Sequence, residues 1–257
     1  MSDWNAGVYH RVSDPQFEWG RRVLARLTLT GRERMADVGC GTGRLTRELV
    51  ERLPHGEVVA VDRSASMLST AAAHLAGLRV RLVRATADAL PFASAFDVVF
   101  STATFHWVLD HDALFRSIFV ALRSGGRLHA QCGGGPNLAR LRRRATILTR
   151  SPEFAQFFGA DWREPWHYSD PKAAEAKLVA AGFISVACTL EPAPIAFENM
   201  EAFRMFVDTV CLHPYLNRLP ESRREPFSAA LLAQAAADDP PFTLDYYRLN
   251  LAATRPR

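Results

Sequence analysis

Short apolar runs alternate with helical segments between residues 34 and 132, and this alternation constrains the fold more than any other feature of the sequence. The apolar runs fall at residues 35–38, 58–61, 80–82, 96–100 and 127–132. In the segment after the first run, Leu45, Leu49 and Leu53 share one face of a helix with a period of 3.6 residues. Strands that alternate with helices of this length form βαβ units, so the sequence predicts a parallel, doubly wound sheet.

Two helices in the predicted fold have recognisable ends. We expect Asp112 to cap the helix whose apolar stripe spans residues 114–122, and the Gly-Gly pair at 125–126 to end it. An Asp-Pro step at residues 170–171 predicts the start of a second helix, because proline is favoured at the first helical position. Gly182 is expected to end that helix.

The second half of the chain adds two strands and a long helical region. Residues 184–190 and 242–253 read as strands, and residues 198–238 read as mostly helical. Three prolines are expected to break this helical region: Pro214, Pro220 and Pro226. The complete prediction is an α/β fold, with a doubly wound, mostly parallel seven-stranded sheet and helical lid insertions.

Composition excludes several classes of protein. Apolar residues make up 48% of the 257 residues and charged residues 23%, which excludes a disordered chain, collagen and a coiled coil. No apolar stretch reaches about 18 residues and no signal peptide is visible, so we expect a cytoplasmic protein without a membrane partner. The cysteines are scattered without a CxxC pair, which predicts free thiols and no metal site. They are Cys40, Cys132, Cys188 and Cys211.

The charge balance is weakly basic, with 31 basic and 27 acidic residues and a net charge of +4. The one dense basic run is at residues 140–144, where four of the five residues are arginines. Such runs usually face water, so a solvated helix face is the first interpretation. Contact with an anionic small molecule and contact with RNA are the alternatives.

A glycine-rich turn at residues 37–43 joins the first strand to its helix. Its glycines follow a GxGxG spacing, and Arg44 stands where a dinucleotide fingerprint requires the third glycine. A phosphate loop is excluded because no Gly-Lys-Ser/Thr follows. Asp37 closes the strand just before the glycines. A strand end with a carboxylate suits a ligand that has no pyrophosphate.

Aspartates follow three successive strands of the predicted sheet. Asp37, Asp62 and Asp88 come at or just past the ends of the first, second and third strands. Open α/β sheets bind ligands at the carboxyl ends of their strands, so these side chains are expected at one site. A carboxylate at Asp62 can accept both hydroxyls of a ribose, and Asp88 can accept from an adenine amino group.

In order and spacing, these motifs resemble the class I S-adenosylmethionine-dependent methyltransferases. The matching segments are residues 37–43, 59–68, 87–92, 96–101 and 122–128. Two other stretches, Trp4-Asn5 with Tyr9 and His106-Trp107, look like the small-molecule branch that contains the trans-aconitate methyltransferases. The resemblance implies the Rossmann-like methyltransferase fold and S-adenosyl-L-methionine as the cofactor.

The resemblance also implies roles for individual residues. Gly39, Gly41 and Gly43 would hold the methionine part of the cofactor, and Asp62 would take the ribose. The N-terminal segment would fold over the cofactor as a lid. The full set of implied cofactor-binding residues is Tyr9, Asp37, Gly39, Cys40, Gly41, Gly43, Asp62, Arg63, Met67, Asp88, Ala89, Ser101 and Thr102.

The predicted reaction is methylation of a small molecule, at the oxygen of a carboxylic acid or a hydroxyl. A hydroxyl acceptor would use a base, for which His106 is the catalytic candidate. A carboxylate acceptor needs no base, and Arg11 or the arginines of residues 140–144 could hold it. An RNA base methyltransferase and a non-catalytic, cofactor-binding regulator are the alternative functions, and nucleic acid is the less favoured partner.

The chain is expected to divide into four segments. Residues 1–33 form an N-terminal helical lid, and residues 34–135 form the cofactor-binding core. Residues 136–182 form a helical, aromatic-rich insertion over the acceptor. Residues 183–257 return to the sheet and carry a helical insertion at 198–238.

Overall fold

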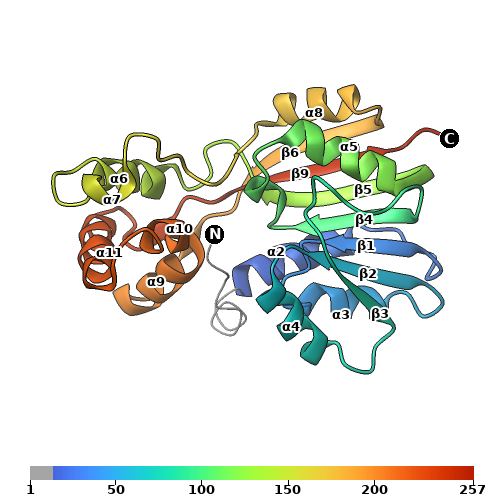
Figure 1. Ribbon diagram of the computed structural model, residues 1–257, viewed down its shortest axis with the longest axis horizontal. Helices are drawn as coiled ribbons and strands as arrows, with labels where there is room; N and C mark the ends of the chain where they lie inside the picture. Colours follow the sequence, from blue (N-terminus) through green and yellow to red (C-terminus); the bar gives the residue numbers. More distant parts are fainter. Residues whose placement is uncertain (1–13) are drawn as a thin grey trace.

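The computed structural model describes residues 14–257, and its centre is a seven-stranded sheet in the order β3-β2-β1-β4-β5-β9-β6 (Figure 1). The strands are β1 (Arg34–Val38), β2 (Glu57–Asp62), β3 (Val80–Arg84), β4 (Phe96–Thr102), β5 (Leu122–Gly133), β6 (Ile184–Pro192) and β9 (Tyr247–Thr254). The first five are parallel, and β9 runs antiparallel between β5 and β6. The predicted doubly wound sheet is confirmed, with β3 at one edge.

Helices cover both faces of this sheet. They are α2 (Asp14–Ala25), α3 (Arg44–Glu51), α4 (Ala65–His74), α5 (His111–Ala121) and α8 (Pro171–Ala180), and a short 3₁₀ helix, η1 (Phe105–Trp107), precedes α5. Successive strand side chains point to opposite faces. In β4, Val98 and Phe100 pack with α2 and α3, whereas Val99 packs with α5.

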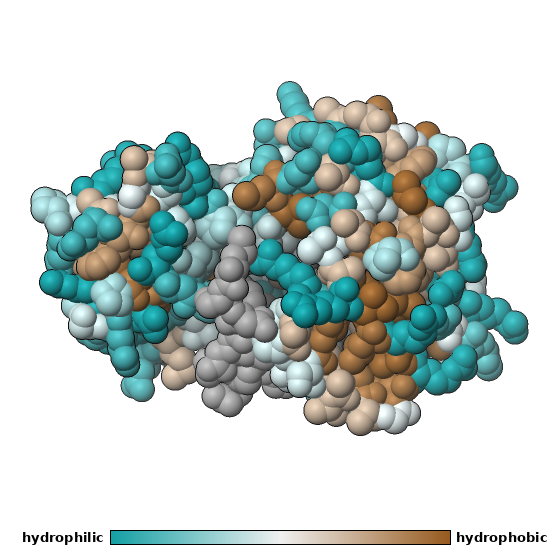
Figure 2. Space-filling model, viewed as in Figure 1, coloured by the Kyte–Doolittle hydropathy of each residue, from teal (hydrophilic) through white to brown (hydrophobic). Residues whose placement is uncertain are grey.

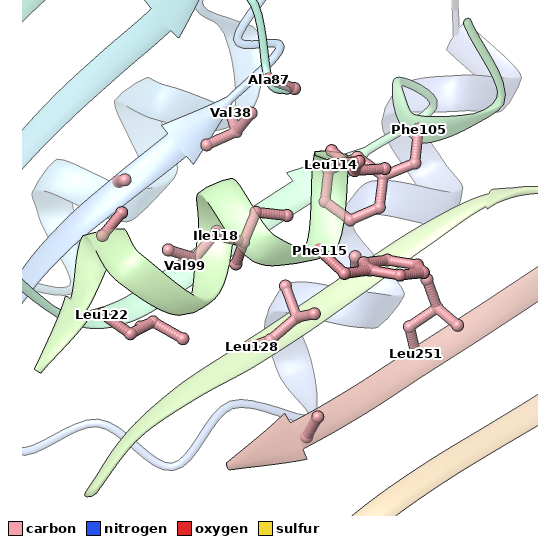
Figure 3. Close-up of a cluster of buried hydrophobic side chains, with 14 of the residues drawn as sticks. Val38, Ala87, Val99, Phe105, Leu114, Phe115, Ile118, Leu122, Leu128 and Leu251 are labelled. Atoms are coloured by element: carbon pink, nitrogen blue, oxygen red, sulfur yellow. The ribbon is translucent and has the colours of Figure 1, made fainter. Parts of the chain in front are cut away.

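The larger of the two sheet-face clusters packs against α5 (Figure 3) and also includes residues of α8. Leu114, Phe115 and Ile118 of α5 are fully buried against the sheet, as the apolar stripe predicts. Ala174 and Leu178 of α8 join the same cluster. α8 is therefore a covering helix of the sheet, although the predicted boundaries placed it in the insertion over the acceptor.

The remaining helices gather in a second lobe beside the sheet, and the molecule narrows between the two lobes (Figures 1 and 2). The lobe contains α6 (Ala139–Thr149), α7 (Ala155–Phe158), α9 (Met200–Phe206), the π-helical η2 (Val207–Cys211), α10 (His213–Leu216), α11 (Glu221–Ala236) and a ribbon of β7 (Ile195–Ala196) and β8 (Thr243–Leu244). Its core is rich in aromatic side chains, with Phe154, Tyr215 and Phe227 fully buried. We call it the helical lobe.

Several predicted helix ends are confirmed and others are wrong. Asp170 caps α8 by accepting a hydrogen bond from the backbone of Ala173, and Gly182 follows the helix with a φ of +101°. The cap of α5 is Asp110 instead of Asp112, because Asp110 Oδ1 accepts from the first backbone N–H groups of the helix.

α5 also ends earlier than predicted, since β5 begins at Leu122 and contains the Gly-Gly pair at 125–126. Pro226 lies inside α11 and does not break it. The predicted strand at 242–253 is two strands, β8 in the helical lobe and β9 in the sheet. No helix within residues 14–257 combines the length and the apolar character needed to cross a bilayer.

Candidate functional site

A cavity of about 450 Å³ lies where the carboxyl ends of the parallel strands face the helical lobe, within the usual size of a small-molecule site. One side, which we call the strand-end side, is lined by segments that follow β1, β2, β3 and β4. The other side, which we call the lobe side, is lined by His106, Trp107, Trp166, Tyr168, Tyr246 and Arg248, among others. The fold thus places one continuous space between the glycine turn and the helical lobe.

The glycine turn lies at the strand-end side. Gly39 and Gly41 both have positive φ angles, but only Gly39 is crowded by a neighbouring side chain. Gly39 has a φ of +77°, and a Cβ there would lie 2.0 Å from Thr104 Oγ1. Gly41 has a φ of +55°, it lines the cavity, and no atom of residues 14–257 lies within 4 Å of a Cβ position there. The backbone of Gly41 is therefore open to close approach by a ligand.

Asp62 links the turn to the second strand. Its Oδ2 accepts a hydrogen bond from the Gly41 N–H at 2.9 Å, and its Oδ1 accepts from the Ser64 N–H at 2.8 Å. Burial raises the pKa of Asp62 despite these hydrogen bonds. Each carboxylate oxygen has a second lone pair, so the group can also accept two hydroxyls of a ribose from the cavity.

Asp37 lies behind the turn, almost completely buried, and accepts a hydrogen bond from Thr46 Oγ1 at 2.6 Å. Burial raises the pKa of Asp37 to about 7. Asp37 and Cys40 line a smaller cavity beside the main one, and burial raises the pKa of the Cys40 thiol. Two buried carboxylates near an open backbone turn fit a ligand that carries a positive charge and a ribose, as S-adenosylmethionine does.

The structure gathers most, but not all, of the other predicted residues. Arg63, Met67, Asp88 and Thr102 line the main cavity together with Gly39, Gly41 and Asp62. The following predicted residues are placed elsewhere: Gly43 packs on Leu75, Ser101 Oγ donates to the Val38 carbonyl, and the Ala89 N–H donates to the Thr86 carbonyl. Tyr9 and Trp4 lie outside the described residues, as does Arg11.

His106 lines the lobe side of the cavity with only 8% of its surface exposed. Its ring stacks on Tyr168 at 5.6 Å, and its Nδ1 accepts a hydrogen bond from the Gly133 N–H at 3.4 Å. Burial lowers the pKa of His106 well below its usual range, and the charge of Arg248 lowers it further. The ring is therefore neutral near pH 7, and Nε2 carries its proton because Nδ1 accepts.

Arg248 is the main site residue that sequence reasoning missed. It is the second residue of β9, is 2% exposed and lines the cavity. Its Nε donates to Gln131 Oε1 at 3.4 Å, and its guanidinium lies 4.5 Å from the centre of the Trp19 ring. The available signal was the one charged residue in a mostly apolar strand.

Unusual backbone also surrounds the cavity. Ala103 and Leu138 line it with φ angles of +53° and +55°, which residues other than glycine adopt only rarely. Val210 and Cys211, which also line it, belong to the π-helical turn η2. Strained residues and π-helical turns occur preferentially at functional sites, in agreement with the position of this cavity.

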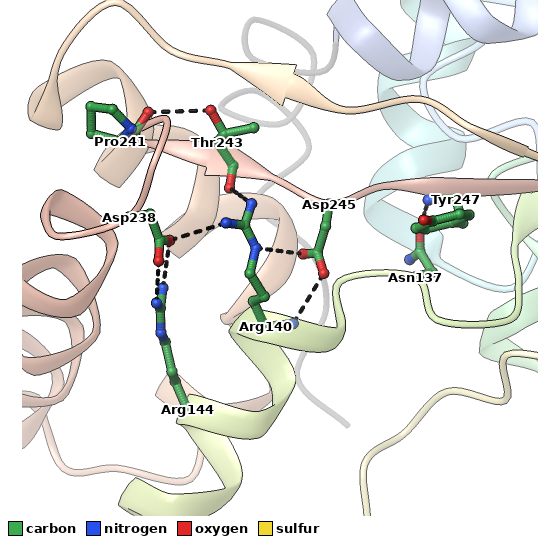
Figure 4. Close-up of polar contacts among 8 residues, drawn as sticks. All are labelled: Asn137, Arg140, Arg144, Asp238, Pro241, Thr243, Asp245 and Tyr247. Atoms are coloured by element: carbon green, nitrogen blue, oxygen red, sulfur yellow. Dashed lines mark hydrogen bonds and ion pairs between the residues drawn. The ribbon is translucent and has the colours of Figure 1, made fainter.

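The basic run of α6 binds carboxylates within the helical lobe instead of facing water (Figure 4). Arg144 makes two hydrogen bonds to Asp238, at 2.9 and 2.5 Å. Arg140 pairs with Asp238 at 3.6 Å and with Asp245 at 3.9 Å, and Arg142 Nε donates to Glu164 at 2.8 Å. The predicted solvated face is thus wrong for these three arginines.

Comparison with known proteins identifies similar sequences and folds. A family model described as a methyltransferase domain matches residues 35–126. The trans-aconitate 2-methyltransferase of Rhodopseudomonas palustris (strain BisB5) is 30% identical over 94% of this chain and 93% of its own length. That of Deinococcus radiodurans is 28% identical over 98% of both chains.

Among solved structures, the YcgJ protein from Bacillus subtilis has a TM-score of 0.63 at 17% identity, and the match covers 94% of this chain and 99% of that one. Phosphoethanolamine N-methyltransferase 2 of Haemonchus contortus, solved in complex with S-adenosyl-L-methionine, also has a TM-score of 0.63, at 21% identity. That match covers 98% of this chain and 57% of the other. At these identities the two structures support the fold.

Proposed function

This chain belongs to the class I S-adenosylmethionine-dependent methyltransferases, and we propose that it methylates a carboxylate oxygen of a small organic acid. S-adenosyl-L-methionine is its cofactor. The observation that carries the choice of a carboxylate is Arg248, a buried guanidinium at the lobe side of the cavity. Arginine binds carboxylates through two parallel N–H donors, and a guanidinium has the same charge over the whole physiological pH range.

The cofactor would occupy the strand-end side. The Gly41 backbone would lie against its methionine part, the Asp62 carboxylate would accept the ribose hydroxyls, and Asp37 would face its amino group. Met67 and Asp88 would lie against the adenine. The shared cavity then supports transfer toward the lobe side, where Arg248 would hold the acid.

When bound, S-adenosylmethionine supplies an electrophilic methyl group: an acceptor oxygen forms the O–CH₃ bond while the C–S bond breaks and its electron pair goes to sulfur. A carboxylate acceptor is already ionised, so no proton has to be removed. His106 then has no role as a base, and its Nε2–H can donate a hydrogen bond into the cavity. The remaining requirements are positioning and exclusion of water.

The helical lobe would exclude water from the reacting groups. Trp166 and Tyr168 from the segment before α8, and Val210 and Cys211 from η2, line the cavity opposite the sheet. Helical segments at 136–169 and 198–238 would thus cover the acceptor.

The test incubates the purified protein with S-adenosylmethionine and separate panels of small carboxylic acids, phenols, amines and RNA oligonucleotides. We expect S-adenosylhomocysteine to form only with acids, together with a product 14 Da heavier. Mild alkali should release the methyl group as methanol, since esters hydrolyse and methyl ethers do not. A methylated phenol, amine or RNA base with no acid turned over would contradict the proposal.

A further inference from the structure

The lobe side of the cavity carries far less positive charge than a multiply charged acid requires. Among the described residues that line the whole cavity, two are cationic, Arg63 and Arg248. Arg63 follows β2 and Arg248 lies on β9. These strands are four positions apart in the sheet, which corresponds to about 19 Å at about 4.8 Å per step. Among the described residues, one guanidinium therefore serves the lobe side.

Other basic side chains near the cavity are held elsewhere by carboxylates. Arg140, Arg142 and Arg144 lie on α6, which starts right after the cavity-lining Leu138. The partners of Arg140 and Arg144 are Asp238 and Asp245 (Figure 4), and the partner of Arg142 is Glu164. Redirecting any of them to a ligand would leave a partly buried carboxylate without its cation, at a substantial cost.

The same cavity carries three carboxylates of its own, Asp62, Asp88 and Asp110. Asp110, three residues after η1, would repel additional negative charge on an acid held at the lobe side, whereas Asp62 and Asp88 lie with Arg63 at the strand-end side. The neutral state of His106 removes the remaining titratable cation among the described lobe-side residues. An acid with two or three carboxylates would thus bury charges that nothing described in this cavity compensates.

Aromatic and aliphatic side chains make up much of the rest of the lobe side, together with Asn137 and Cys211. Trp107 and Trp166 meet edge to face at 5.4 Å, and Tyr168 stacks near Trp166 at 6.1 Å. Leu138 and Val210 add aliphatic surface to this wall. Such a wall gains free energy by covering an apolar group and gains little by covering a second carboxylate.

We propose that the acceptor is a monocarboxylic acid with an apolar, preferably aromatic, body, whose single carboxylate is held by Arg248. This inference rests on the proposed function and narrows it. It separates this chain from relatives whose names specify trans-aconitate, because trans-aconitate has three carboxylates. The Nε1–H of the cavity-lining Trp166, which is buried and has no hydrogen-bond partner among the described residues, would be a second donor for the same carboxylate.

The experiment measures the affinity of the full chain, saturated with S-adenosylhomocysteine, for benzoate, phenylacetate, cinnamate, octanoate and trans-aconitate. At least one monocarboxylate should bind about tenfold or more tightly than trans-aconitate, because two uncompensated carboxylates oppose burial. The same order should hold for kcat/KM in methyl transfer. Equal or tighter binding of trans-aconitate than of every monocarboxylate would overturn the inference and leave carboxylate methylation standing.

Two arginine variants locate the charge contact. Arg248→Met should reduce the affinity for the preferred monocarboxylate about 30-fold or more, and should affect its neutral methyl ester much less. Arg248→Lys should retain part of the affinity, which controls for loss of folding. Arg123→Met is the matched control, because Arg123 pairs with Asp97 in an exposed contact and does not line the cavity. Equal losses for acid and ester in Arg248→Met would overturn the assignment.

The panel of acids, phenols, amines and RNA oligonucleotides distinguishes a failure of the proposed function from a failure of this narrower inference. If phenols or amines are methylated and no acid is, the proposed function itself is wrong. If trans-aconitate is the best acid and Arg11→Met abolishes its binding, the additional charge comes from residue 11 and only the narrower inference fails.

Discussion

At the scale of single residues, the site depends on how two carboxylates and the glycine turn share a small volume. Asp62 fixes the turn through the Gly41 N–H, while Asp37 is held by Thr46 behind it. Burial raises the pKa of both carboxylates, to about 7 for Asp37, because removal from water makes the charged form costly. A positively charged ligand would relieve this cost, which links cofactor binding to local protonation.

Gly41→Ala should separate ligand binding from folding. Gly41 faces the open cavity, so a methyl group there should obstruct the cofactor and weaken its binding at least about tenfold, with a small loss of unfolding free energy. Gly77→Ala is the matched control, because Gly77 also has a positive φ and open space but does not line the cavity. Calorimetry with S-adenosylhomocysteine measures both variants. Similar affinities in the two would remove Gly41 from the cofactor contact.

Asp37 should make the protein less stable as the pH rises from about 4 to about 7. Its pKa is about 7 in the fold, against an ordinary value of 3.8 in the unfolded chain. In this window the folded state retains a proton that the unfolded state has lost, so raising the pH favours unfolding. Asp37→Asn should flatten this slope in urea titrations at a series of pH values. An unchanged slope would place the buried proton on another group.

At the scale of secondary-structure elements, the helical lobe is held to itself by ion pairs as well as by its aromatic core. Asp238, which follows α11, accepts two hydrogen bonds from Arg144 of α6 and forms an ion pair with Arg140 of the same helix. The two side chains of the Asp238–Arg144 pair are only 12% and 20% exposed, so solvent screens this contact weakly.

Asp238→Asn should destabilise the chain by about 1–3 kcal/mol, the range for losing hydrogen bonds to a charged partner. Glu153→Gln is the matched control in the same lobe, because Glu153 and Arg223 form an exposed pair at 3.3 Å. That variant should change the unfolding free energy by about 0.5 kcal/mol or less. Chemical denaturation measures both. Equal effects would mean that the buried pair contributes no more than a surface pair.

At the scale of the whole molecule, the cavity joins two lobes with different structural origins. The strand-end side belongs to the parallel part of the sheet, in the order β3-β2-β1-β4, whereas the lobe side brings together residues from η1, the segment before α8, η2 and β9. Binding at one side therefore need not order the other.

Hydrogen exchange should show separately which ligand protects the strand-end side of the cavity and which protects the lobe side. S-adenosylhomocysteine alone should protect the backbone of residues 39–41 and 62–67, and addition of the acid should extend protection to residues 137–138, 166–168 and 210–211. Mass spectrometry of peptides from the full chain gives both patterns. Full protection of the lobe-side peptides by S-adenosylhomocysteine alone would show that the two lobes respond as one unit.

The sequence by itself determined the sheet and the strand-end side of the site. Strands and helices are encoded by periodicities within about ten residues, and a positive-φ turn needs glycine locally. Asp37, Gly41 and Asp62 were therefore predictable from their places at successive strand ends. Parallel order brings such ends together without detailed packing.

Only the tertiary structure determined which residues line the lobe side and which carboxylates pair with the arginines of α6. Arg248 enters the cavity because β9 inserts between β5 and β6, and no local pattern specifies that insertion. The partners of the basic run are up to 105 residues away, so their pairing could not be read from the run itself. The sequence predicted Asp112 as the cap of α5, and only the backbone of the folded chain showed that Asp110 holds this position. Contacts between distant segments depend on packing and burial, and these exist only in the folded chain.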